Sequence, residues 1–94
     1  MISAEQVLNS QFKPTRFSAG YEQDEVDDFL DRVVATLRQA ETGQQTGNPL
    51  RSDEVTSVRF ATTKLREGYD QSQVDALLDE VVATIEHHRG RGAL

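Results

Sequence analysis

The sequence of 94 residues predicts an all-α protein built from two copies of one unit, each consisting of a short helix, a loop and a long helix. The first observation is a repeat, because the segment 20–37 recurs in the segment 68–85 without an insertion. The second is that both copies carry apolar residues at the spacing of one helix face. The third is that the segments before them follow neither helical nor strand periodicity. Because a repeated unit of this size seldom buries its own apolar face, we expect the two units to pack on each other.

The first unit, expected to span residues 1–41, opens with a short helix and a loop. Ser3 stands three residues before Gln6, and side chains at this spacing can cap each other's exposed backbone amides, which predicts a helix at about residues 4–10. The next segment contains Pro14 and continues neither period, so we expect an extended loop there.

Each unit continues through a turn glycine and a tyrosine into a long amphipathic helix. The tyrosines are expected to pack and to form hydrogen bonds within the turns. An isolated helix of about 18 residues is marginal in water, so each apolar stripe needs a partner. The stripes form the expected helix-pairing face, which comprises Val26, Phe29, Leu30, Val33, Val34 and Leu37 in the first unit and Val74, Leu77, Leu78, Val81, Val82 and Ile85 in the second.

A flexible linker is expected between the units and a disordered tail after them. Residues 42–51 are mostly polar and include two glycines and a proline. The second unit, residues 52–89, repeats the order of the first, and residues 90–94 form the tail. The linker can reach along a helix of this length, so parallel pairing, antiparallel pairing and exchange between two chains all stay open. We expect a small helical bundle or short coiled coil that can also dimerise.

The composition narrows the classes of function. The net charge of −6 argues against a general nucleic-acid binder. The absence of cysteine excludes a disulfide framework and a thiolate metal cluster. No apolar run approaches the roughly 20 residues that span a bilayer, and the first residues lack the features of a signal peptide. A cytoplasmic location is therefore expected.

Catalysis, metal binding and cofactor binding are not expected. Aspartates four positions apart, such as Asp27 and Asp31, project together from both long helices, but no activated nucleophile or phosphate-binding loop accompanies them. The adjacent residues His87 and His88 would point to different sides of a helix. A small helical DNA-binding or antitoxin-like regulator is a weaker alternative, because acidic residues line the helix that would enter the groove of DNA.

The two units share a longer motif that resembles a known family. In the first unit it comprises Phe12, Thr15, Arg16, Phe17, Gly20, Tyr21, Glu25, Val26, Asp27, Phe29, Leu30 and Asp31. In the second unit it comprises Phe60, Thr63, Lys64, Leu65, Arg66, Gly68, Tyr69, Asp70, Val74, Asp75, Leu78 and Asp79. Both units resemble the N-terminal domain of the DivIVA family of bacterial cell-division and polar-growth scaffolds. The doubled motif is most similar to actinobacterial members that carry several such motifs in a short chain.

The resemblance implies a non-enzymatic module that forms a parallel helical dimer. In the long members of the family, it also implies contact with anionic membrane through an apolar loop residue beside a basic one. By position, these roles fall on Phe17 with Arg16, and on Leu65 with Lys64 and Arg66. The implied partners are further copies of the chain, as a homo-oligomer, or a longer scaffold protein of the same family. The implied location is the cytoplasm, with peripheral contact at the inner face of the membrane.

The residues alone leave two alternatives to membrane contact. The apolar loop residues can close the end of a small core, and a protein adaptor can use the helix stripe or an acidic face without any membrane. One inserted Phe or Leu contributes about 1.5 to 3 kcal/mol, and each basic residue adds about 1 kcal/mol. A single loop would therefore bind weakly, whereas two loops at the same end of a parallel bundle would act together.

Overall fold

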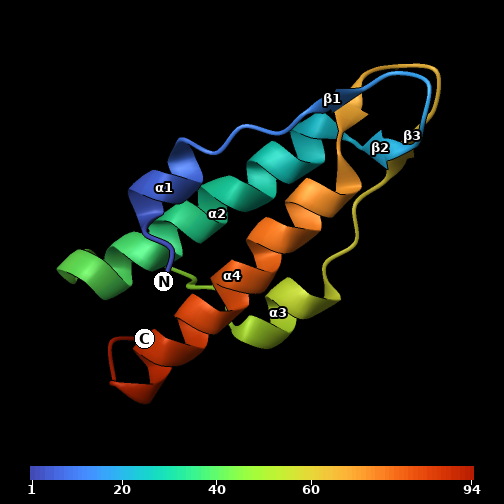
Figure 1. Cartoon of the computed structure of the whole chain (residues 1–94). Coiled ribbons are helices and arrows are strands. Elements are labelled where there is room, and N and C mark those ends of the chain that lie inside the picture. Colours follow the sequence, from blue (N-terminus) through green and yellow to red (C-terminus); the bar gives the residue numbers. More distant parts are fainter.

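The computed structural model describes all 94 residues and shows four helices with a small antiparallel sheet at one end (Figure 1). The expected all-α class, as a helical bundle or a coiled coil, is therefore wrong, and the chain is mixed α/β. The elements in chain order are α1 Ala4–Leu8, β1 Pro14–Thr15, β2 Gly20–Tyr21, α2 Gln23–Thr42, α3 Ser52–Ser57, β3 Thr62–Thr63, β4 Gly68–Tyr69 and α4 Gln71–Gly90.

The sheet forms from the segments expected to be extended loops, and its strands are exchanged between the units. The strand order is β1-β4-β2-β3, so both outer strands pair with a strand of the other unit. The two inner strands meet at Tyr21 and Tyr69. Each strand has only two residues and finds its partner in the other unit, so no alternation within either loop could predict the sheet.

Hydrogen bonds next to the sheet extend the exchange to the helix starts. The backbone N–H of Asp70 donates to the carbonyl of Lys13 at 2.9 Å, and the N–H of Lys13 donates to Oε1 of Gln73 at 2.6 Å. Equivalent bonds recur in the other half of the molecule at the corresponding positions. The loop of each unit is thus attached to the first turn of the other unit's long helix.

Two glycines permit the close crossing of the exchanged strands. A Cβ atom at Gly20 would lie 2.9 Å from the backbone oxygen of Tyr69, and a Cβ at Gly68 would lie 2.9 Å from the backbone oxygen of Tyr21. The same atoms would lie 2.1 Å and 2.3 Å from the hydroxyls of neighbouring threonines. Only a residue without a side chain fits at these two positions, because backbone atoms leave no room for a Cβ.

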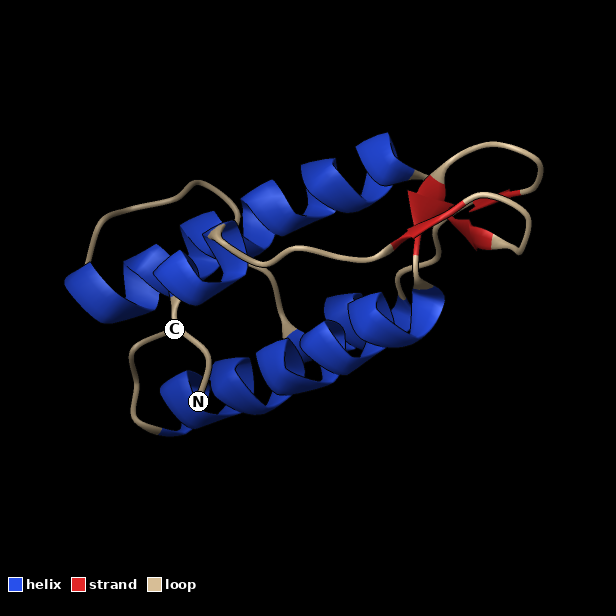
Figure 2. Cartoon of the chain, turned by 45° about the horizontal axis from the view of Figure 1, so that its top comes forward, coloured by secondary structure: helices blue, strands red, loops and turns tan.

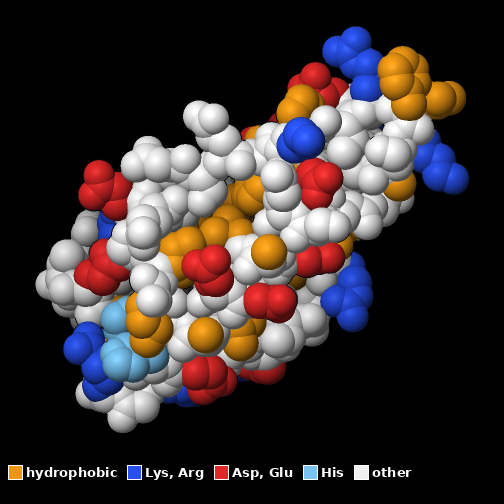
Figure 3. All heavy atoms as spheres, viewed as in Figure 1, with side chains coloured by type: hydrophobic (Ala, Val, Ile, Leu, Met, Phe, Trp, Pro, Cys, Tyr) orange, Lys and Arg blue, Asp and Glu red, His pale blue; other side chains and the backbone are white.

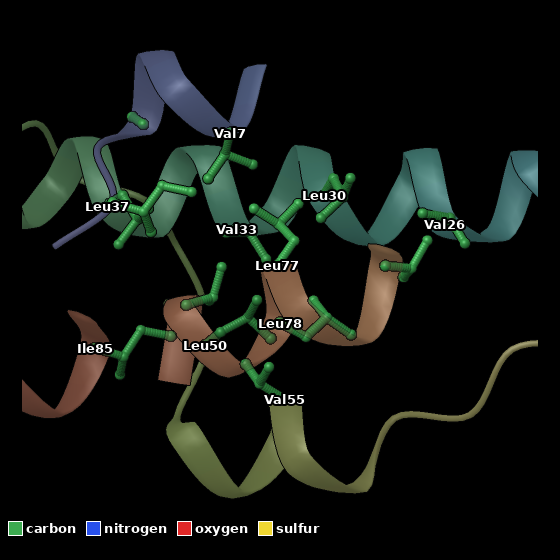
Figure 4. Packing of buried hydrophobic residues seen from close by; sticks show 14 residues of the cluster. Val7, Val26, Leu30, Val33, Leu37, Leu50, Val55, Leu77, Leu78 and Ile85 are labelled. Atoms are coloured by element: carbon green, nitrogen blue, oxygen red, sulfur yellow. The ribbon is translucent and has the colours of Figure 1, made fainter. Parts of the chain in front are cut away.

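The long helices α2 and α4 run in parallel, because both start beside the paired inner strands (Figures 1 and 2). The short helix α1 packs on α2, and α3 packs on α4. In Figure 4, Val7 lies between the first pair of helices and Val55 between the second, while Leu77 points from α4 toward α2. One continuous hydrophobic cluster fills the body of the molecule, which measures 44 × 22 × 20 Å.

The predicted helix-pairing face lies within this core. Its fully buried members are Val26, Val33, Leu37, Val74, Val81 and Ile85, and its nearly buried members are Leu30, Leu77 and Leu78. Its partly buried members, Phe29, Val34 and Val82, pack against the same cluster. Burial of both stripes in one cluster explains why neither unit has a separate core.

The segments outside the two units also contribute to the fold. Leu50, at the end of the segment expected to be a flexible linker, is buried, and its N–H donates to Oγ1 of Thr36 on α2 at 2.9 Å. The corresponding bond joins the N–H of Ile2 to Oγ1 of Thr84 at 3.0 Å. At the far end, where a disordered tail was expected, the chain turns after α4 and Leu94 packs partly against the core.

We predict that Gly20→Ala destabilises the protein by about 1–3 kcal/mol, because the added methyl group collides with backbone atoms of the exchanged strand. Urea unfolding followed by circular dichroism measures the change. Gly47→Ala is the matched control, since nothing lies within 4 Å of a Cβ there. A free energy of unfolding for Gly20→Ala equal to that of the control would contradict the tight crossing.

We predict that Leu30→Asp abolishes folding, because it places an unpaired carboxylate in the shared core at a cost above about 4 kcal/mol. Leu78→Asp in the second unit should have the same effect. Ala76→Asp, at an exposed position of α4, is the control and should keep the helical circular dichroism signal. Full helicity in the Leu30 variant would mean that the stripe is not essential to the core.

Candidate functional site

The loops that connect the strands, residues 16–19 and 64–67, project together beyond the sheet and form what we call the tip (Figure 1). Two large apolar side chains lie here almost fully in solvent, Phe17 at 88% exposure and Leu65 at 83%. Basic side chains surround this apolar protrusion at the end of the molecule (Figure 3). The strand exchange brings the two loops side by side, because β1 pairs with β4 and β2 with β3.

Leu65 is held in an unusual backbone conformation. Its φ angle is +62°, and it is the only residue other than glycine with positive φ. The left-handed region costs an L-residue with a Cβ about 1–2 kcal/mol. The exposed side chain of Leu65 makes few contacts that could offset this free energy. A leucine at this position is therefore not explained by the stability of the fold.

The three basic residues of the tip differ in their surroundings. Arg16 lies 3.7 Å from a carboxylate oxygen of Glu67, and Arg66 forms an ion pair with Glu22. Lys64 forms no ion pair within the chain. The guanidinium groups of Arg16 and Arg66 are mainly exposed, so both can still bind an anion. The carboxylates of Glu67 and Glu22 offset part of their positive charge.

The base of the tip is fixed by aromatic residues and aspartates that contact each other across the units. The hydroxyl of Tyr69 donates to Asp27 at 2.8 Å, and the hydroxyl of Tyr21 donates to Asp75 at 2.8 Å. The ring of Tyr69 lies 5.1 Å from that of Phe12, and a matching aromatic pair occurs in the other half. These hydrogen bonds join each tyrosine to the long helix of the other unit. The predicted hydrogen bonds within the turns are therefore wrong, because the pattern of one repeat contains no information about contacts with the other.

The tyrosine hydroxyls are held in the protonated form. Burial is the first cause that raises the pKa of Tyr69, to about 12, and the hydrogen bond to Asp27 is the second. The pKa of Tyr21 is also raised, by burial and then by its bond to Asp75. A protonated hydroxyl can donate to the aspartate, whereas a tyrosinate would be repelled by it.

We predict that stability contributed by Tyr69 is complete below pH 10 and is lost as the pH rises through about 12, because its pKa is raised in the folded state. Ultraviolet titration of tyrosinate in Tyr21→Phe follows Tyr69 alone. Adding Asp27→Asn should lower the pKa of Tyr69, since that removes the acceptor carboxylate. Titration of Tyr69 near the ordinary tyrosine value of about 10 in the folded protein would contradict the cross-unit bond.

Two other classes of site find no support in the structure. No group of three or more His, Cys, Asp or Glu side chains is placed to hold a metal ion. No helix combines the length with the apolar character that a membrane-spanning helix requires. The adjacent His87 and His88 lie near the end of α4, far from the tip in sequence and at the opposite end of the helix.

Comparison of the chain with protein-family models, with curated proteins and with solved structures gives no match.

Proposed function

We propose that the chain is a non-enzymatic scaffold or adaptor of the DivIVA type, which acts in bacterial cell division or polar growth and touches the anionic inner face of the membrane through its tip. The observation that carries the proposal is the exposure of Phe17 and Leu65 on adjacent loops, next to Arg16, Lys64 and Arg66. Exposed bulky apolar residues beside cations are the combination that an anionic bilayer surface binds.

The free energies expected from these side chains support a reversible contact with the membrane. Each of the two apolar side chains can contribute about 1.5 to 3 kcal/mol on insertion. Lys64, which has no ion pair, can add about 1 kcal/mol near an anionic leaflet, and the two paired arginines less. Because both loops project from one sheet, they insert as a single rigid element and their contributions combine without a further loss of translational freedom.

The rest of the surface restricts which part can approach a membrane. The net charge is −6, and acidic residues such as Asp24, Asp28 and Glu80 are exposed along the long helices. An anionic surface repels these sides and attracts the tip. The molecule would therefore bind by its end and leave the body free for contacts with proteins.

A protein adaptor without membrane contact is the second candidate. The ion pairs of Arg16 and Arg66 favour it, because they reduce the positive charge that a lipid headgroup would meet. In that case the exposed tip would insert into a pocket of a protein partner, and lipid composition would have no effect on its binding.

We predict that the protein co-sediments with vesicles that contain phosphatidylglycerol and that the double variant Phe17→Ser, Leu65→Ser loses at least about tenfold in affinity, since both insertions are removed. Lys64→Gln should weaken binding and reduce its dependence on salt. Leu8→Ser is the control, because Leu8 is exposed on the side of the body. Binding that is unaffected in the double variant would remove the membrane role of the tip. Equal binding of the unchanged protein to neutral phosphatidylcholine vesicles would remove the preference for an anionic surface.

A further inference from the structure

Two open grooves flank the body at positions that the repeat relates to each other. Each groove lies between a long helix and the short helix of the same unit with the segment that follows it, and a tyrosine of the other unit contributes to the lining. The first-unit groove has a volume of about 540 Å³ and is lined by residues that include Leu8, Phe12, Leu30, Asp27, Asp31 and Tyr69. The second-unit groove, of about 440 Å³, uses the corresponding helix positions.

The second-unit groove contains a cation of its own. Arg59 lines it, and the guanidinium donates to the carbonyl oxygens of Val58 at 2.9 Å and Thr56 at 3.4 Å. Arg59 lies close enough to Tyr21 for its charge to lower the pKa of that hydroxyl, against the larger raising effects of burial and Asp75. A basic group thus accompanies the tyrosine and aspartate in this half.

The first-unit groove lacks that cation. Its position equivalent to Arg59 is Gln11, which carries no charge, and no Lys or Arg is among its lining residues. Asp27 accepts the hydrogen bond from Tyr69, and Asp31 makes no ion pair or side-chain hydrogen bond within the chain. The groove therefore presents two carboxylates, and no basic side chain lines it.

The same groove also exposes an apolar side chain that its counterpart does not have. Leu8 is 57% exposed at its rim, whereas the corresponding residue in the second unit is Thr56. The partly buried ring of Phe12 lies nearby in the lining. The two halves thus differ in charge and in apolar surface at one symmetry-related place.

We propose that the first-unit groove binds a peptide segment of a protein partner in which a lysine or arginine stands beside a bulky apolar residue. The apolar side chain of the peptide covers Leu8 and Phe12, and its cation faces Asp27 and Asp31. The cation thus takes the place that Arg59 has in the second-unit groove. The opposite charges give selectivity and fast association, and the apolar contact supplies most of the affinity. This inference rests on the adaptor role proposed above but not on membrane contact by the tip.

Selection of a displayed random peptide library on the immobilised full chain tests the proposal. The enriched peptides should carry Lys or Arg within two positions of Leu, Ile, Phe or Met, and their binding should weaken with salt. Asp31→Lys and Leu8→Ser should each reduce the affinity of a selected peptide by about tenfold. Asp79→Lys is the matched control at the equivalent place in the second unit and should leave that affinity unchanged.

Several results would overturn the proposal. These are no enrichment, enrichment of acidic or uncharged peptides, equal loss in Asp79→Lys, and loss only in Phe17→Ser, which would place the binding at the tip. Light scattering that shows self-association lost in Asp31→Lys would mean that a second copy of the chain occupies the groove instead. Vesicle binding should persist in Asp31→Lys and Leu8→Ser, so failure of the groove and failure of the tip give different results.

Discussion

The exchange of two-residue strands between the units is the constraint on which the rest of the structure depends. The backbones of the two inner strands cross so closely that only glycine fits at positions 20 and 68. The exchange also places the starts of both long helices next to each other. Parallel helices follow from that placement, and so does a single shared core. Each outer strand pairs with a strand of the other unit, so neither unit could form the sheet alone.

The same exchange creates the candidate functional site. Each loop turns back between two strands that pair with the other unit, so both loops must leave the sheet at the same end. Residues that are 48 positions apart, such as Phe17 and Leu65, thereby become neighbours on one protrusion. The rigid base of tyrosine hydroxyls and aspartates keeps this protrusion fixed relative to the helices.

Duplication within one chain lets the two halves differ where a symmetric dimer could not. The tip carries Phe17 in one loop and Leu65 in the other, and only Leu65 has the left-handed backbone. The grooves differ in the same way, since Arg59 has an uncharged counterpart in Gln11. The two halves therefore present different side chains at the tip and in the grooves, a difference that two identical subunits could not have.

The sequence by itself determined the two units, the short and long helices and the apolar stripes, because N-terminal helix caps and helical periodicity are local signals. The tip residues were named through the resemblance of the repeated motif to the DivIVA family. Only the tertiary structure decided the sheet, the parallel direction, the cross-unit bonds of Tyr21 and Tyr69, and the burial of Leu50. These features depend on pairing between residues far apart in the chain, and strands of two residues are too short to have a period of their own.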